Sequence, residues 1–186
     1  MKLILASSSP RRAEVLRDAG LSFSVLTSAI DETPYPGETP QHLVERLAAA
    51  KADLVAARAI GPAIVIAADT VVLLEGQILG KPRSTDDARR MLEQLSGRTH
   101  SVLTGIALIR LPDVEQRRFV ESTLVHFARL DAEEITRYLA TEEPYDKAGA
   151  YAIQEKTDMI VEEYLGSFSN VVGLPLERLQ VELEAW

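Results

Sequence analysis

The sequence predicts a mixed α/β domain, and three features of the 186-residue chain support this class. A short apolar run, a hydroxyl-rich loop and a helical pattern follow one another at the N-terminus, as in a strand, a loop and a helix. Residues 63–68 form an unbroken apolar run that is typical of a central strand covered on both faces. Residues 100–111 and 117–130 are two long alternating runs joined at Pro112-Asp113, which indicates an antiparallel pair.

Composition and charge narrow the functional classes. Apolar residues make up 46% of the chain, enough for a sizeable core, and the absence of Cys excludes disulfides and thiolate chemistry. The formal net charge of −8 argues against broad binding to nucleic acid but leaves room for a small anionic ligand. The apolar runs are too short to span a membrane and no signal-peptide pattern is seen, so we expect a cytoplasmic protein. Without repeats or linkers, residues 1–186 are expected to form a single domain.

The first predicted helix begins at a loop that suits an anion. Ser9 stands at the N-cap position, Pro10 at N1 and Gly20 at the C-terminal stop. A helix N-terminus offers unpaired N–H groups and partial positive charge, and Arg11 and Arg12 add forked donors that match phosphate oxygens. The alternative is a well-capped surface helix with two solvated arginines.

A second predicted helix opens at Thr39-Pro40, and one lysine lies on its apolar face. That face consists of Leu43, Val44, Leu47, Leu54 and Val55. Lys51 lies among them, so its ammonium must either extend to solvent or meet an anion. Glu32 lies in the acidic loop before this helix and is the candidate functional carboxylate of that loop.

Asp69 stands within a nearly continuous apolar stretch. The strand of residues 63–68 is predicted to end at Asp69-Thr70, before a further apolar run at 71–74. A carboxylate there costs free energy unless it is paired or bound to a metal, and ligand sites of α/β sheets gather at strand ends. A functional role is therefore favoured over that of a structural, hydrogen-bonded aspartate.

The second half of the chain adds weaker candidates. Lys81 follows a glycine as in a P-loop, but the spacing is one residue short and Pro82 replaces the hydroxyl residue, so Lys81 is a candidate cation or an ordinary exposed lysine. On pattern alone, residues 144–154 indicate a packed turn into a strand, and residues 166–170 a polar loop. The histidines lack the spacing of a zinc site or a catalytic triad; they are His42, His100 and His126.

Several motifs occur in a fixed order and together resemble one family over nearly the whole chain. They are Ala6-Ser7-Ser8-Ser9-Pro10-Arg11-Arg12, Asp31-Glu32-Thr33, Lys51, Ala68-Asp69-Thr70, Gly80-Lys81-Pro82, residues 146–151 with Ile153-Gln154, and residues 169–175. This set resembles the Maf family of nucleoside triphosphate pyrophosphatases. The resemblance implies an inosine-triphosphatase-like (Maf/Ham1-type) α/β fold, with a long curved mixed sheet flanked by helices and two lobes around a cleft.

The resemblance also implies a reaction and roles for individual residues. A nucleoside triphosphate would be hydrolysed between its α and β phosphates, with a divalent cation (Mg²⁺ or Mn²⁺) as cofactor and a homodimer as the assembly. Asp69 would be the proton acceptor, and Glu32 and Asp69 would hold the metal. The other residues with an implied role in catalysis or substrate binding are Lys51, Lys81, Ser7, Ser9, Arg11 and Arg12.

Three positions bear on the substrate. Arg11, Thr70 and Gln154 resemble the dTTP/UTP branch of the family, whereas the 7-methyl-GTP branch carries Trp, Gln and Glu there. Uracil and thymine present an N–H between two carbonyls, which an amide can pair, whereas the two donors of guanine suit a carboxylate. We therefore expect a dTTP/UTP pyrophosphatase; a 7-methyl-GTP pyrophosphatase and a non-catalytic nucleotide-binding regulator of cell division are the alternatives. Glu155 stands where the family usually has Gly, which bears on base recognition.

Overall fold

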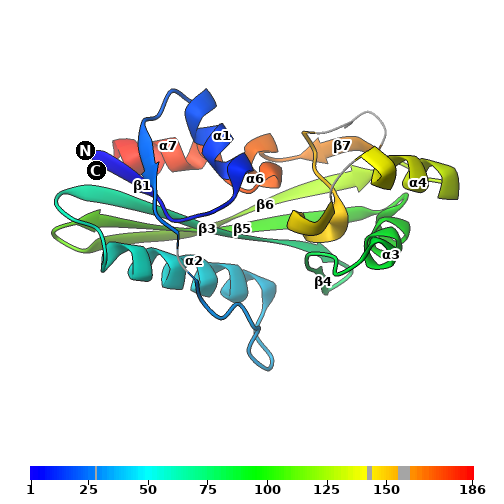
Figure 1. Cartoon of the computed structure of the whole chain (residues 1–186), viewed down its shortest axis with the longest axis horizontal. Coiled ribbons are helices and arrows are strands. Elements are labelled where there is room, and N and C mark those ends of the chain that lie inside the picture. Colours follow the sequence, from blue (N-terminus) through cyan, green and yellow to red (C-terminus); the bar gives the residue numbers. More distant parts are fainter. Residues whose placement is uncertain (28, 142–143, 155–159) are drawn as a thin grey trace.

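The structure is a computed structural model that describes residues 1–27, 29–141, 144–154 and 160–186. Its centre is an open mixed sheet, which within these ranges has seven strands in the order β2-β1-β3-β5-β6-β7, with β4 beside β3 (Figure 1). β1 pairs in parallel with β2 and β3, whereas β3, β5, β6 and β7 pair antiparallel in succession. The strands are β1 (Lys2–Leu5), β2 (Phe23–Val25), β3 (Ala63–Leu74), β4 (Gln77–Leu79), β5 (Thr99–Leu111), β6 (Glu115–Phe127) and β7 (Val161–Leu165).

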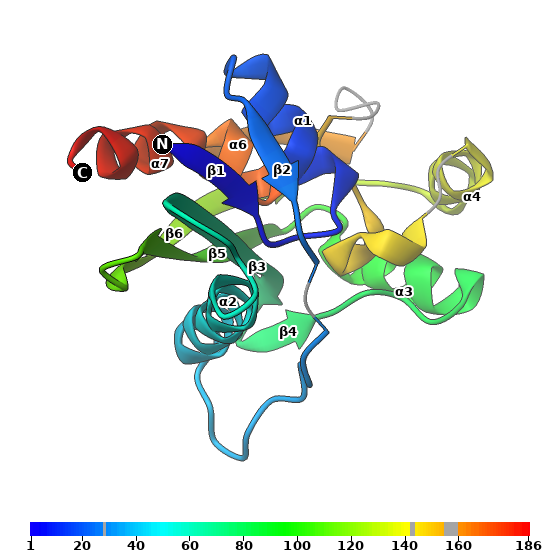
Figure 2. The ribbon, with the colours of Figure 1, turned by 60° about the vertical axis from the view of Figure 1, so that its left-hand side comes forward.

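Helices cover both faces of this sheet. α2 lies against one face, α1, α6 and α7 lie against the other, and α3 and α4 gather at one end (Figures 1 and 2). Ser9 and Thr39 cap α1 and α2, each followed by a proline at the first helical position, as the sequence predicts. The helices are α1 (Pro10–Asp18), α2 (Pro40–Ala56), α3 (Thr85–Leu95), α4 (Ala132–Thr141), α6 (Phe168–Val172) and α7 (Leu176–Glu184), with 3₁₀ turns η1 (Pro144–Asp146) and η2 (Ala148–Ala150).

β3 is buried on both faces because its side chains alternate between two apolar clusters. Its even-numbered residues from Ile64 to Ala68 join the cluster formed with α1, α6 and α7, and its odd-numbered residues from Ala63 to Ala67 pack against α2. This two-sided burial is what an unbroken apolar strand requires. Within the described ranges, every helix is too short or too polar to span a bilayer.

β3 does not end at Asp69-Thr70, where the sequence predicted its end. The strand continues to Leu74, because β5 pairs with it on through the pairs Asp69↔Gly105 and Thr70↔Thr104. The ladder to β5 supplies hydrogen-bond partners on that edge, so the carboxylate does not interrupt the strand.

The opposite edge of β3 carries a gap in the sheet. β1 pairs with β3 as far as Leu5↔Ile66, and β4 begins to pair with it at Val72↔Leu79. Between these pairs, at residues 67–71, no strand of the described chain lies against this edge. Asp69 therefore lies within this gap and not at the end of its own strand.

Two further expectations on local structure are wrong. Residues 166–170 contain the start of a helix, because the hydroxyl of Ser167 accepts a hydrogen bond from Asn170 N at 3.0 Å and caps α6. Residues 144–154 form two 3₁₀ turns, and the described part of this segment contains no strand.

α2 lies close to the sheet at Gly105, and its buried face differs from the one that the sequence predicted. Leu54 was expected on that face but is 42% exposed, whereas Ala48 and Ala52 are buried against the sheet. At Gly105 of β5, an added Cβ would lie 2.4 Å from the carbonyl oxygen of Val44. Small residues on both elements therefore allow the backbones of α2 and β5 to approach each other.

Candidate active site

The loop before α1 lies beside the gap in the sheet. Ser7 Oγ accepts a hydrogen bond from Ser9 N at 3.2 Å, and Ser9 Oγ accepts one from Arg12 N at 3.4 Å. These bonds fold the loop and cap the first turn of α1, where Pro10 provides the fixed backbone angle of the first position. The N-terminus of α1, with its partial positive charge, is thereby directed toward the gap.

Arg12 connects this loop to the sheet and to the corner after α6. Its Nη1 donates to Ala68 O at 2.9 Å and to Ser7 Oγ at 3.2 Å, and its Nη2 donates to Thr70 Oγ1 at 2.9 Å. Its Nε donates to Gly173 O at 2.8 Å. Of the five guanidinium N–H groups, four thus bind partners in the described chain and one, on Nη2, is left for a ligand. Past the end of β1, the carbonyl of Ala68 on the edge of β3 therefore accepts a hydrogen bond from a side chain, that of Arg12, in place of a neighbouring strand.

Asp69 and Thr70 point to opposite faces of β3, and Asp69 faces α2. There Lys51 Nζ lies 2.6 Å from Asp69 Oδ1 and 2.6 Å from Glu32 Oε1. The Lys51 ammonium therefore meets anions, which was one of its two expected arrangements. The Asp69 side chain is 11% exposed and that of Glu32 is 56% exposed, so one carboxylate of the pair is buried and the other faces solvent.

The two carboxylates differ in their proton affinity. Burial raises the pKa of Asp69 above its ordinary value, although Lys51 and Arg12 lower it in part. Burial also acts to raise the pKa of Glu32, but Lys51, Lys81 and Arg12 outweigh it and the pKa falls below its ordinary value. Burial likewise lowers the pKa of Arg12, against the opposing effect of Asp69. Of the two carboxylates, Asp69 is therefore the better proton acceptor.

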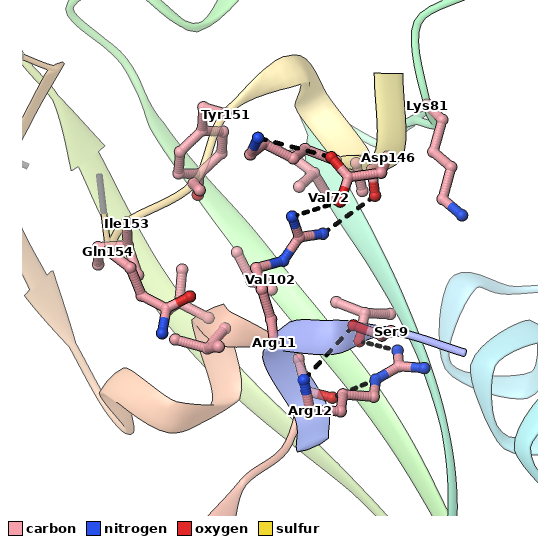
Figure 3. Close-up of a pocket in the computed structure, with 17 residues that line it drawn as sticks. Ser9, Arg11, Arg12, Val72, Lys81, Val102, Asp146, Tyr151, Ile153 and Gln154 are labelled. Atoms are coloured by element: carbon pink, nitrogen blue, oxygen red, sulfur yellow. Dashed lines mark hydrogen bonds and ion pairs between the residues drawn. The ribbon is translucent and has the colours of Figure 1, made fainter. Parts of the chain in front are cut away.

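Arg11 and Asp146 form an ion pair across the cleft. Arg11 Nη1 donates to Asp146 Oδ2 at 2.8 Å and Nη2 donates to Asp146 O at 3.0 Å, which joins α1 to η1. The buried Lys147 lies on the other side of this carboxylate, with Nζ 3.5 Å from Asp146 Oδ1. In Figure 3, Gln154 and Lys81 lie on opposite sides of the Arg11–Asp146 pair.

Two adjoining hollows surround this ion pair. The Gln154 hollow, of about 110 Å³, is lined by the end of η2 and the corner after α6, and Tyr151, Ile153 and Gln154 form one wall (Figure 3). The Lys51 hollow, of about 190 Å³, is lined by the loop before α1 together with Glu32 and Lys51. The residues that line both are Ser9, Arg11, Arg12, Lys81 and Asp146. A single ligand could therefore extend through both hollows past the Arg11–Asp146 pair.

The structure brings together the residues that the sequence singled out. Those that line one or both hollows are Ser7, Ser9, Arg11, Arg12, Glu32, Lys51, Thr70, Lys81 and Gln154. Asp69 lies behind the lining and is reached through Lys51. Glu155 lies outside the described residues.

Three residues of the site were not predicted from the sequence. Asp146 and Lys147 were visible as an acid–lysine pair inside a quoted motif, but nothing in the pattern linked them to Arg11. The third is Thr104, whose hydroxyl lies 3.0 Å from that of Thr70. Its only indication in the sequence was that it is a polar residue within the apolar stretch of β5.

The carboxylate pair suits a divalent cation shared with a ligand. Lys51 Nζ lies between Glu32 Oε1 and Asp69 Oδ1, 2.6 Å from each, so the second oxygen of each carboxylate is the hard donor that remains for a cation beside the ammonium. Mg²⁺ prefers such donors and commonly uses one or two protein carboxylates together with phosphate oxygens. The described residues contain no group of three or more acidic, His or Cys side chains that could hold a metal. The residues present thus fit a cation bound jointly by the protein and a phosphate-bearing ligand.

Fold and site together define an α/β protein with an open mixed sheet and a cleft in which cations and carboxylates converge. Such a cleft suits a ligand with several negative charges. The chain belongs to the Maf family, since the family model described as Maf-like protein matches residues 2–186.

Relatives of similar length carry one name. A protein of Pelotomaculum thermopropionicum named dTTP/UTP pyrophosphatase is 47% identical over 178 residues, which cover 96% of this chain and 93% of that protein. A protein of Carboxydothermus hydrogenoformans with the same name is 46% identical over 186 residues, which cover 100% of this chain and 99% of that protein.

A solved structure shares the fold. A HAM1 protein from Coxiella burnetii is 17% identical, with a TM-score of 0.55 over 100% of both chains. At this identity the likeness concerns the fold alone, and it confirms the inosine-triphosphatase-like, Maf/Ham1-type α/β fold predicted from the sequence.

Proposed function

We propose that this protein hydrolyses dTTP and UTP between the α and β phosphates and releases the monophosphate and pyrophosphate. The observation that carries the proposal is the convergence of Glu32, Lys51 and Asp69 beside the capped N-terminus of α1. The names of relatives that are 46–47% identical over nearly the whole chain support the same reaction.

The chemistry requires charge neutralisation and a proton acceptor. Attack of water on the α-phosphorus is opposed by the surrounding anionic oxygens, so catalysis depends on cations placed around the phosphates. Lys51 and Lys81 line the Lys51 hollow and supply two such charges. Asp69 Oδ1 accepts a hydrogen bond from Lys51, while Oδ2 has no partner in the described chain and is available to accept a proton from water.

A divalent cation, Mg²⁺ or Mn²⁺, is part of the proposal. Glu32 and Asp69 would hold it together with phosphate oxygens, and it would neutralise charge on the triphosphate. Removal of the metal with EDTA is expected to abolish hydrolysis, and added Mg²⁺ or Mn²⁺ is expected to restore it.

The substrate is expected to lie with its base in the Gln154 hollow and its phosphates in the Lys51 hollow. The exposed amide of Gln154 can both donate to and accept from the edge of a pyrimidine. Arg11 lies at the junction of the two hollows, where its charge would face the phosphates once the pair with Asp146 opens.

A hydrolysis screen tests the proposal. Wild-type protein and Asp69→Asn are incubated with dTTP, UTP, dCTP, ATP and 7-methyl-GTP, and pyrophosphate release is measured with Mg²⁺, with Mn²⁺ and with EDTA. We expect dTTP and UTP to be hydrolysed fastest, with a large loss in the variant. Preference for 7-methyl-GTP would overturn the substrate assignment, and tight nucleotide binding without pyrophosphate release would favour a regulator of cell division.

We expect residues 1–186 to act as a single domain, in the cytoplasm, and as a homodimer. Light scattering coupled to size exclusion measures the assembly directly, and a monomeric mass at micromolar concentration would contradict the dimer.

A further inference from the structure

A buried hydroxyl of β5 lies behind the site. Thr104 is 0% exposed and pairs in register with Thr70 of β3. A buried hydroxyl without a partner costs free energy, so its hydrogen bonds indicate its role. Thr104 Oγ1 lies 3.0 Å from Thr70 Oγ1 and donates to Asn170 O at 3.3 Å.

These contacts fix the direction of a hydrogen-bond chain. A threonine hydroxyl has a single proton, and that of Thr104 goes to Asn170 O. We assign the proton between the two threonines to Thr70, because its oxygen accepts from Arg12 Nη2 at 2.9 Å and this arrangement gives both hydroxyl protons an acceptor. The chain runs from Arg12 through Thr70 and Thr104 to Asn170, and each hydroxyl both accepts and donates, which strengthens its neighbours.

The far end of this chain is anchored. Asn170 is 0% exposed, and its Nδ2 donates to Val102 O at 3.1 Å and to Thr123 Oγ1 at 3.0 Å. These bonds pin α6 to β5 and β6. The same corner holds Arg12 directly, through Gly173 O, and an added Cβ at Gly173 would lie 3.3 Å from Thr70 Oγ1. The corner after α6 thus holds Nε of the guanidinium directly, and α6 holds Nη2 through the two threonines.

We propose that Thr104 is a positioning residue that holds the guanidinium of Arg12, through Thr70, in one orientation at the junction of the two hollows. Two consequences follow. The remaining N–H on Nη2 keeps a fixed direction toward a ligand. The proton of Thr70 is committed to Thr104, so the Thr70 hydroxyl offers a ligand an acceptor and no donor. The effect on hydrolysis rests on the proposed function, whereas the effect on Arg12 does not.

Thr104→Val and Thr104→Ser separate the hydroxyl from the shape of the side chain. Valine keeps the volume and removes the hydroxyl, and serine keeps the hydroxyl. Ser96→Ala is the matched control, because it removes a hydroxyl that bonds the backbone of Leu130 far from the site. Guanidinium signals of Arg12 are recorded by ¹H–¹⁵N NMR and assigned by their loss in Arg12→Lys.

We expect separate, slowly exchanging Arg12 guanidinium signals in wild type, Thr104→Ser and Ser96→Ala, and averaged Nη2 signals in Thr104→Val, where Nε and Nη1 keep their own partners. In parallel, kcat/KM for dTTP should fall roughly two- to tenfold in Thr104→Val, the size of one lost neutral hydrogen bond, and return in Thr104→Ser. Wild-type Arg12 signals in a folded Thr104→Val protein would overturn the inference, as would averaged signals in Thr104→Ser.

Two further results separate the inference from the proposed function. If the wild type hydrolyses none of the nucleotides while Thr104→Val averages the Arg12 signals, the positioning role stands and the proposed function fails. If Thr104→Val does not fold, Thr70→Val breaks the same chain one residue closer to Arg12. It is expected to average the same signals, and unchanged signals there would refute the chain.

Discussion

Replacement of Asp69 by Asn separates catalysis from stability. The amide keeps the shape of the side chain and can still accept from Lys51 Nζ, so the geometry around the lysine should persist. What is lost is the proton acceptor, and loss of a general base lowers rates by about 10²–10⁴-fold. We therefore expect kcat to fall by at least roughly a hundredfold, about 2.7 kcal/mol in the activation free energy.

The same substitution should not destabilise the fold. The pKa of Asp69 is raised in the folded state, chiefly by burial, so its contribution to stability is greatest when the carboxyl is protonated and is lost as pH rises through the folded pKa. Ionisation of this buried carboxyl therefore costs free energy that a neutral Asn does not incur. We expect the thermal midpoint of Asp69→Asn at pH 7 to equal or exceed that of the wild type.

The assay combines pyrophosphate release from dTTP with thermal unfolding of the same samples. Asp53→Asn is the matched control, since it makes the same change at an exposed carboxylate of α2 and should leave kcat unaltered. Turnover within a few-fold of wild type in Asp69→Asn would refute the role of Asp69 as base. A large fall in its thermal midpoint would refute the account of its pKa.

Three further substitutions test other parts of the molecule. Lys51→Met leaves the carboxylates of Glu32 and Asp69 without the ammonium that bonds both, so kcat/KM for dTTP should fall by roughly a hundredfold or more, and a smaller loss would count against a role in charge neutralisation. Gln154→Glu should raise the relative rate with 7-methyl-GTP over dTTP, and an unchanged ratio would remove this residue from base selection. Burial lowers the pKa of His100 from 6.5 to about 4, so the folded state loses stability as pH falls through this range. His100→Phe should flatten that loss in unfolding scans between pH 7 and pH 4, and an unchanged slope would contradict the assignment.

Much of the fold could be predicted because local signals agreed with the tertiary structure. Ser9 and Thr39, each followed by proline, mark the starts of α1 and α2, and both side chains accept the expected capping hydrogen bonds. Burial of β3 on both faces followed from its unbroken apolar pattern. The continuation of β3 past Asp69 could not be predicted, because it depends on the ladder to β5, and the pattern of β3 does not contain that pairing.

For the candidate site, individual residues could be predicted from the sequence, but several of their contacts could not. Lys51 and Asp69 could be predicted because each is a charged residue in an apolar segment. A buried charge costs free energy unless it is paired or bound by a ligand. The contacts between segments distant in sequence could not be predicted from spacing. Arg11 lies 135 positions from Asp146, and the carbonyl that accepts from Arg12 Nε belongs to Gly173, 161 positions away. Such contacts depend on how the corners of the chain pack, which local pattern does not specify.

The alternation of β3 has a consequence for how new specificity could arise. Neighbouring residues of the strand lie on opposite faces of the sheet. Asp69 contacts Lys51 of α2 on one face, whereas Thr70 contacts Arg12 of α1 on the other, beside the corner after α6. Mutations that reshape the wall around Thr70 but keep Arg12 in place can therefore accumulate while the contacts of Lys51 with Glu32 and Asp69 persist. We expect this architecture to permit exchange of the preferred nucleobase while the hydrolytic machinery is inherited intact.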